Sequence, residues 1–290
     1  MVMFQKSERD LKEIQNTKRN NFFVFSLFFI SILQAQIDQR FDLFDWEIIG
    51  NNGSINSISE GYQYIYFATN GNGILRFSKF SRDFEKGLYF GQGLISKKIK
   101  HVYFDKVTGT LWSVGSKALE FSYSREGNWN SIDYAKLSIN SFHDIIDIGS
   151  SSNFIWIKTS SAYIKLDHIN ASFLGMLSFP DEEKIFWGDI SYKHDSPYEK
   201  INFNNYFIEN SWLLSINSAF DQNGILAKYI SLLETENSYS FIGLTNGQVL
   251  LIDKFSRTIK PINYGIEMTA PLTISYEKKV WLAGIGDKKS

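Results

Sequence analysis

Residues 64–82 read YIYFATNGNGILRFSKFSR, and residues 239–257 read YSFIGLTNGQVLLIDKFSR. Both stretches hold two runs rich in β-branched and aromatic residues, joined by an Asn-Gly turn, and both end in the tetrapeptide Lys-Phe-Ser-Arg. Asn and Gly tolerate the positive φ of tight turns, so each stretch predicts a β-hairpin. The tetrapeptides begin at Lys79 and Lys254, which are 175 residues apart. That separation is close to four periods of about 44 residues, and it predicts a repeat protein.

Weaker copies of the unit are found at residues 109–115 (GTLWSVG), 154–159 (FIWIKT) and 280–284 (VWLAG). The aromatic residue of the first strand recurs in every copy, at Tyr66, Trp112, Trp156, Phe241 and Trp281. The steps between these positions are 46, 44, 85 and 40 residues, so the long step predicts a divergent blade or an insertion at residues 179–225. Because the three tryptophans share one strand position, we expect them to pack in the core.

Short strands separated by Gly, Asn, Asp and Ser clusters fill each unit, and no sustained helical period follows residue 40. Four short antiparallel strands in every 40–45 residues are typical of a β-propeller, in which each sheet is one blade. We therefore expect an all-β protein with about five full blades and a partial sixth. Residues 44–49 predict an outermost strand. A six-bladed ring with an incomplete closing blade and a truncated copy of a longer propeller both fit this count, and we favour truncation.

The second unit carries the most specific motif. It contains Gly91-Gln92-Gly93-Leu94-Ile95-Ser96, followed by Phe104-Asp105, Thr108-Gly109 and Leu111-Trp112. This series resembles the repeat of two-component-regulator propellers, and the pattern extends over most of residues 45–290. The chain is also similar, more weakly, to the N-terminal propeller of a type IX secretion component. The resemblance implies a bacterial β-propeller that is exported from the cytoplasm.

The N-terminus has the layout of a secretory signal peptide. Five basic residues within residues 1–21 precede the apolar run FFVFSLFFISIL at residues 22–33, and Ala35 follows. This run of twelve residues, ten of them apolar, is too short for a spanning helix, which needs about twenty apolar residues. We expect a signal peptide at residues 1–35 and a propeller domain at residues 36–290. An uncleaved signal anchor is the alternative. The mature protein would then be secreted or periplasmic, with cell-surface association as a further option and no stable membrane insertion.

Composition limits the possible partners. The 30 basic residues are balanced by 31 acidic ones, and the predicted mature chain has a net charge of −3. Nucleic-acid binding needs a clustered basic excess, so we expect no nucleic-acid partner. The absence of Cys excludes disulfides, thiolate metal sites and thiol nucleophiles.

No motif assigns a catalytic residue, a metal or a cofactor. The four histidines, His101, His143, His168 and His194, lack the spacing of metal ligands, and there is no Gly-x-Ser-x-Gly motif for a serine nucleophile. The acidic run at residues 181–183 is typical of a solvated loop.

The region at residues 179–225, where the repeat breaks, supplies the candidate binding residues. Loops that depart from a rigid repeat scaffold often carry binding function. This region is rich in aromatic and polar residues, and the candidates are Trp187, Tyr192, His194, Tyr198 and Trp212. A degraded blade with ordinary hydrophobic content is the alternative interpretation.

These observations predict a non-catalytic extracytoplasmic β-propeller that acts as a sensory, ligand-binding or protein-interaction module, with a protein or glycan ligand that the sequence does not identify. One alternative is a glycan-active propeller hydrolase or lyase, because propeller active sites assemble from distant segments. Another is the sensor fragment of a longer hybrid two-component protein.

Overall fold

The computed structural model describes residues 52–90, 92–123, 128–188, 190–191, 203–235, 238–264, 268–276 and 280–287, with side chains only up to residue 264 and not at 190–191. The chain divides into residues 1–46 and residues 47–290, and all the described residues belong to the second unit. The predicted signal peptide at residues 1–35 and the predicted strand at residues 44–49 lie outside the described residues.

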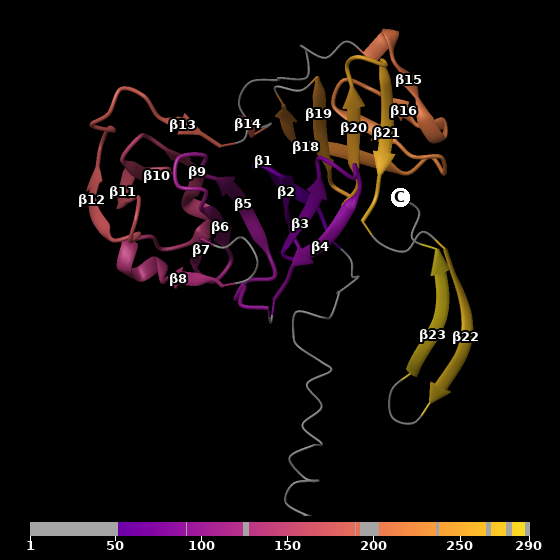
Figure 1. Ribbon diagram of the computed structural model, residues 1–290, viewed down its shortest axis with the longest axis horizontal. Coiled ribbons are helices and arrows are strands. Elements are labelled where there is room, and N and C mark those ends of the chain that lie inside the picture. Colours follow the sequence, from indigo (N-terminus) through magenta and orange to yellow (C-terminus); the bar gives the residue numbers. More distant parts are fainter. Residues whose placement is uncertain are drawn as a thin grey trace, which may run out of the picture. The chain divides into compact units, whose positions relative to one another are not determined.

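Four antiparallel sheets, each built on four consecutive strands, dominate the described residues (Figure 1). The first blade contains β1 (Ile55–Glu60), β2 (Tyr64–Thr69), β3 (Ile74–Ser78) and β4 (Phe84–Leu88). The second contains β5 (Ile99–Phe104), β6 (Leu111–Gly115), β7 (Leu119–Ser122) and β8 (Asn130–Ile132). The third contains β9 (Ile145–Ser150), β10 (Phe154–Thr159), β11 (Tyr163–Asp167) and β12 (Phe173–Leu177). The fourth contains β18 (Leu226–Glu234), β19 (Tyr239–Leu244), β20 (Val249–Asp253) and β21 (Thr258–Ile262). The predicted all-β architecture of four-stranded antiparallel blades is confirmed.

The remaining elements are short, apart from one hairpin formed by β22 (Met268–Tyr276) and β23 (Val280–Asp287). Single 3₁₀ turns lie at Tyr134–Leu137, Phe142–Asp144, Phe203–Asn205 and Glu209–Ser211.

The described part of residues 179–225 supplies strands of two or three residues, which extend neighbouring blades. These are β13 (Phe186–Trp187), β14 (Ile190–Ser191), β15 (Phe207–Ile208), β16 (Leu213–Leu214) and β17 (Ser218–Phe220). β13 pairs with β9 of the third blade, β14 and β17 pair with β18, and β15 runs parallel to β21. Within the described residues, this segment therefore adds to two existing sheets.

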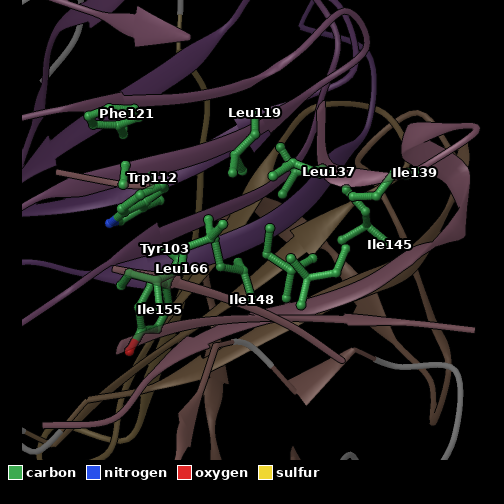
Figure 2. Packing of buried hydrophobic residues seen from close by; sticks show 14 of the residues in the cluster. Tyr103, Trp112, Leu119, Phe121, Leu137, Ile139, Ile145, Ile148, Ile155 and Leu166 are labelled. Atoms are coloured by element: carbon green, nitrogen blue, oxygen red, sulfur yellow. The ribbon is translucent and has the colours of Figure 1, made fainter. Parts of the chain in front are cut away.

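Blades pack face to face through apolar side chains, and β1 contacts both β5 of the second blade and β18 of the fourth. One cluster joins the first and second blades, another joins the second and third, and a third joins the first and fourth. Figure 2 shows the second of these clusters, where Trp112 and Leu119 of the second blade lie near Ile148 and Ile155 of the third.

The repeated aromatic position is buried in each of these blades, and it lies on the second strand and not on the first strand that the sequence pattern predicted. Tyr66, Trp112, Trp156 and Phe241 are on the second strand of their blades, and each is at most 3% exposed. The prediction that the tryptophans at this position pack in the core is thus confirmed for two of them. The side chain of Trp281 lies outside the described residues.

Hydrogen bonds from side chains to the main chain also join first strands of adjacent blades. The Asn56 amide donates to the Ile99 carbonyl at 2.7 Å, and Ser59 Oγ accepts from the Phe104 N–H at 2.9 Å. On the other side of β1, Ser231 Oγ donates to the Ile55 carbonyl at 2.9 Å. Polar side chains on these strands thus bind the main chain of the next blade.

Candidate functional site

A small concave pocket lies between the first and fourth blades. The first blade contributes residues from the end of β1, from β2, from β3 and from the turn after β3. The fourth blade contributes Thr235, directly after β18, with others from β19 and β20. Segments about 170 residues apart in the sequence therefore build one concave site.

The floor of the pocket is apolar and aromatic. It is formed by Ile65 and Phe77 of the first blade and by Phe241 and Leu251 of the fourth. The rings of Phe77 and Phe241 meet edge to face with their centroids 5.5 Å apart, and both side chains are buried. This geometry is favourable for aromatic pairs, and it fixes the two blades against each other.

An ion pair forms one side of the rim. Lys79 Nζ lies 2.6 Å from Glu60 Oε1, and Lys106 Nζ lies 3.8 Å from the other oxygen of the same carboxylate. Glu60 thus has two lysine partners and is largely screened from the attraction of a further cation. Both groups of the closer pair are mostly buried, so the pair is better protected from solvent than a surface ion pair.

Arg82 and Tyr239 also lie at the rim. The Arg82 guanidinium lies over the Tyr239 ring, 5.3 Å from its centroid, as in a cation–π contact. Arg82 has φ 56° at the end of the turn, and its N–H donates to the Ser78 carbonyl at 3.0 Å. Among the described residues, no hydrogen bond or ion pair engages its guanidinium. The exposed arginine therefore has N–H donors available at the edge of an apolar pocket.

The second Lys-Phe-Ser-Arg turn repeats this local structure without forming part of the pocket. Lys254 Nζ lies 3.3 Å from Glu234 Oε1, and Arg257 has φ 53°. The Arg257 carbonyl accepts from the Phe207 N–H at 2.8 Å, because β15 runs alongside β21 at this turn. The molecule thus holds two copies of one turn, of which the first lines a pocket.

A second polar cluster joins the second and third blades. Asp105 accepts hydrogen bonds from the N–H groups of Val107 and Thr108, from Thr108 Oγ1, and from Ser150 Oγ at 2.9 Å. His168 Nε2 lies 2.6 Å from Asp105 Oδ2. Tyr103 completes the cluster, with its hydroxyl 2.7 Å from Ser150 Oγ and donating to the Phe186 carbonyl at 3.0 Å.

This cluster contains residue types found in catalytic sites, but it is a buried network between two blades. Asp105, Ser150, His168 and Tyr103 are each at most 7% exposed. Burial alone raises the pKa of Asp105, but hydrogen bonds from Thr108 and Val107, with the nearby His168, hold that pKa below its ordinary value. Burial raises the pKa of Tyr103 to about 12. The carboxylate is thus satisfied by its own loop and the neighbouring blade, and the cluster joins the two blades.

Asp147 lies on β9, and among the described carboxyl groups its pKa is raised furthest towards neutral pH. Burial raises its pKa to about 7, against the opposing effects of a hydrogen bond from the Ile148 N–H and the charge of Lys158. Asp147 lies near Gly188, at the end of the segment that covers β9, and its charge contributes to the raised pKa of Tyr103.

The structure places two of the five residues predicted to bind. Trp187 is on β13, partly buried, with its ring 6.0 Å from that of Tyr163. Trp212 is buried against the fourth blade, in a cluster with Tyr229 and Leu232. Tyr192, His194 and Tyr198 lie outside the described residues. The two placed tryptophans thus belong to different sheets.

The pocket was not predicted, although its sequence signal is present. The repeated Lys-Phe-Ser-Arg marks both turns, and a glutamate ends the first strand of each of these two blades, at Glu60 and Glu234. A glutamate at the end of the first strand, together with the lysine of the tetrapeptide, predicts the ion pairs Glu60–Lys79 and Glu234–Lys254. The pairing of Arg82 with Tyr239 depends on which blades are neighbours, and the repeat does not specify this.

No group of three or more His, Cys, Asp or Glu residues within the described ranges is arranged to hold a metal ion. Across those same ranges, the structure contains no helix with the length and apolar character that a membrane span requires.

The fold and the pocket together define a protein built from propeller-type blades with a concave site between two of them. No protein-family model matches the sequence, and no curated protein matches it significantly.

Solved structures do match the fold. The chain is similar to the extracellular domain of the one-component system BT4673 from B. thetaiotaomicron, with 13% identity over 78% of this chain and 26% of that one, at a TM-score of 0.36. It is also similar to PorZ, a surface component of the type-IX secretion system of Porphyromonas gingivalis, with 10% identity, coverage of 78% and 30%, and a TM-score of 0.36. The dihydro-heme d1 dehydrogenase NirN matches with 8% identity, coverage of 76% and 49%, and a TM-score of 0.32.

The chain thus spans between about a quarter and a half of the length of these matched chains. The extracellular domain of BT4673 is also described as that of a hybrid two-component system, so BT4673 and PorZ are of the two kinds of protein that the repeat motif resembles.

Proposed function

We propose that this chain is an extracytoplasmic, non-catalytic propeller module that binds a small molecule or the end of a peptide in the pocket between its first and fourth blades. The observation that carries the proposal is the pocket itself. An apolar aromatic floor provides contact area, and a few charged groups on the rim provide orientation, which is the usual composition of a ligand site. Extracytoplasmic placement follows from the signal-peptide pattern at residues 1–35.

A sensory role fits this site. Because the ligand would contact two blades, binding would stabilise their packing, and a change in blade packing can be transmitted to a partner. The segment at residues 179–225, with Trp187, Tyr192, His194, Tyr198 and Trp212, remains our second proposed contact surface. Phe186 beside Trp187 is 63% exposed, and Leu213 beside Trp212 is 69% exposed, so this segment presents apolar side chains to a partner.

The test is a ligand-observed NMR screen of small carboxylates, amines, alcohols and saccharides. The wild-type protein is compared with Leu251→Trp, which fills the floor of the pocket, and with Leu226→Trp, which places the same side chain at an exposed position of β18. We expect binders whose signal is lost in Leu251→Trp and kept in Leu226→Trp. Circular dichroism checks that both variants fold.

Two outcomes would contradict the proposal. Compounds that give the same binding signal with the wild type, Leu251→Trp and Leu226→Trp would place the site elsewhere, for example in the segment at residues 179–225. Release of product from a saccharide would show catalysis and would revive the hydrolase alternative.

A further inference from the structure

Resting on the proposed binding role of the pocket, we infer that its ligand class is an apolar monocarboxylate, with the carboxylate on Arg82 and an aromatic or branched aliphatic body on the floor. The apolar floor of the pocket favours a ligand with an aromatic or branched aliphatic group. Phe77 and Phe241 contribute their rings from the two neighbouring blades, and Ile65 and Leu251 extend the apolar lining. A hydrophobic group that enters there removes apolar surface from water on both sides.

The charges of the rim select the head group. Lining the pocket are the carboxylate of Glu60 and the cations of Lys79 and Arg82, which gives a net charge of +1. Glu60 is occupied by Lys79 at 2.6 Å and approached by Lys106 at 3.8 Å. A ligand ammonium would therefore have to compete with two lysines for one carboxylate, whereas a ligand anion meets a guanidinium that has no bonded partner among the described residues.

Arg82 is suited to a carboxylate by its shape. A guanidinium offers parallel N–H donors that match the two oxygens of a carboxylate, and its planar group can do this while it stays stacked on the Tyr239 ring. Asp253 is a nearby acid, and the charge of Arg82 is one of the causes that lower the pKa of its carboxyl group. Burial raises the Asp253 pKa, but hydrogen bonds from Ser256 and Phe255 in its own turn and the charge of Arg82 lower it. The Asp253 carboxylate is thus engaged by its own turn.

The test uses four compounds with one aromatic body and different heads: 3-phenylpropionate, 3-phenylpropanol, 3-phenylpropylamine and phenylalanine. Affinities are measured by NMR titration for the wild-type protein, Arg82→Ala and Arg257→Ala. Arg257 is the matched control because it occupies the same turn position with the same backbone conformation outside the pocket.

We expect 3-phenylpropionate to bind about tenfold more tightly than the alcohol, since one charge-assisted bidentate contact is worth about 1.4 kcal/mol. Arg82→Ala should abolish this preference and leave alcohol binding within about twofold, while Arg257→Ala should leave both affinities unchanged. Equal binding of acid and alcohol, tighter binding of the amine, or the same loss in Arg257→Ala would overturn the inference.

Failure of this inference can be told apart from failure of the proposed function. If the amine or the alcohol is preferred and Leu251→Trp still abolishes its binding, the pocket is a ligand site and only the ligand class is wrong. If none of the four compounds responds to Leu251→Trp, and no compound in the wider screen does so, both proposals fail.

Discussion

At the scale of single residues, the structure separates polar groups that hold blades together from groups that face a ligand. Asp105 and Ser150 have the chemistry of an active site, but Ser150 donates to Asp105, and Asp105 also accepts from two main-chain N–H groups inside the protein. Arg82 is exposed, and its guanidinium lies over the ring of Tyr239. Residue type alone does not distinguish these cases, because burial and partners decide what a side chain can do.

The first prediction at this scale concerns the ionisation of Asp147. Its folded pKa of about 7 lies above the value near 4 of an unfolded chain, so the folded state favours the protonated form. The stability contribution of this group is therefore full below about pH 4 and lost as the pH rises through 7. Asp147→Asn keeps an acceptor for the Ile148 N–H and removes the charge. Relative to the wild type, we expect the variant to gain about 1–3 kcal/mol of unfolding free energy between pH 4 and pH 8.

Urea unfolding at several pH values provides the measurement. Parallel stability profiles for the two proteins would show that Asp147 ionises normally in the folded state.

At the scale of elements, the repeat predicts strands and turns well and predicts their partners poorly. The two related stretches at residues 64–82 and 239–257 were expected to form hairpins, and β2–β3 and β19–β20 pair as antiparallel neighbours. The short strands β13 and β15 had no such signal, because each joins a distant strand, β9 or β21, through two residue pairs. A contact of that length leaves no periodic pattern in the sequence.

The close approach of the first and fourth blades gives a prediction at this scale. A Cβ added at Gly243 on β19 would lie 2.6 Å from Ile55 Cγ2 and 2.3 Å from Ser231 Oγ. Gly243→Ala should therefore push β1 away and lower the free energy of unfolding by about 1–3 kcal/mol. Lys228→Ala, at an exposed position of β18, should change it by less than about 0.5 kcal/mol.

Denaturant unfolding of the two variants and the wild type measures both values. A Gly243→Ala protein as stable as the wild type would mean that the two blades are not in contact at this point.

At the scale of the whole molecule, neighbouring blades share a pocket that belongs to neither alone. Blade size, strand number and the buried aromatic position were predictable because they recur at a fixed period. The neighbour of each blade could not be predicted in the same way. The fourth blade packs on the first through Phe241 and Phe77, whereas the repeat specifies only that every blade needs a partner for its apolar face.

The pocket therefore depends most on the packing of these two blades around it. A double-mutant cycle with Phe77→Leu, Phe241→Leu and the double variant tests this packing directly, with the free energy of unfolding measured in urea. Because the two rings meet edge to face, we predict a coupling energy of about 0.5–1.5 kcal/mol, so that the double variant is less destabilised than the sum of the single variants. Additive effects within about 0.3 kcal/mol would mean that the rings do not touch, and would contradict both the packing and the pocket that it forms.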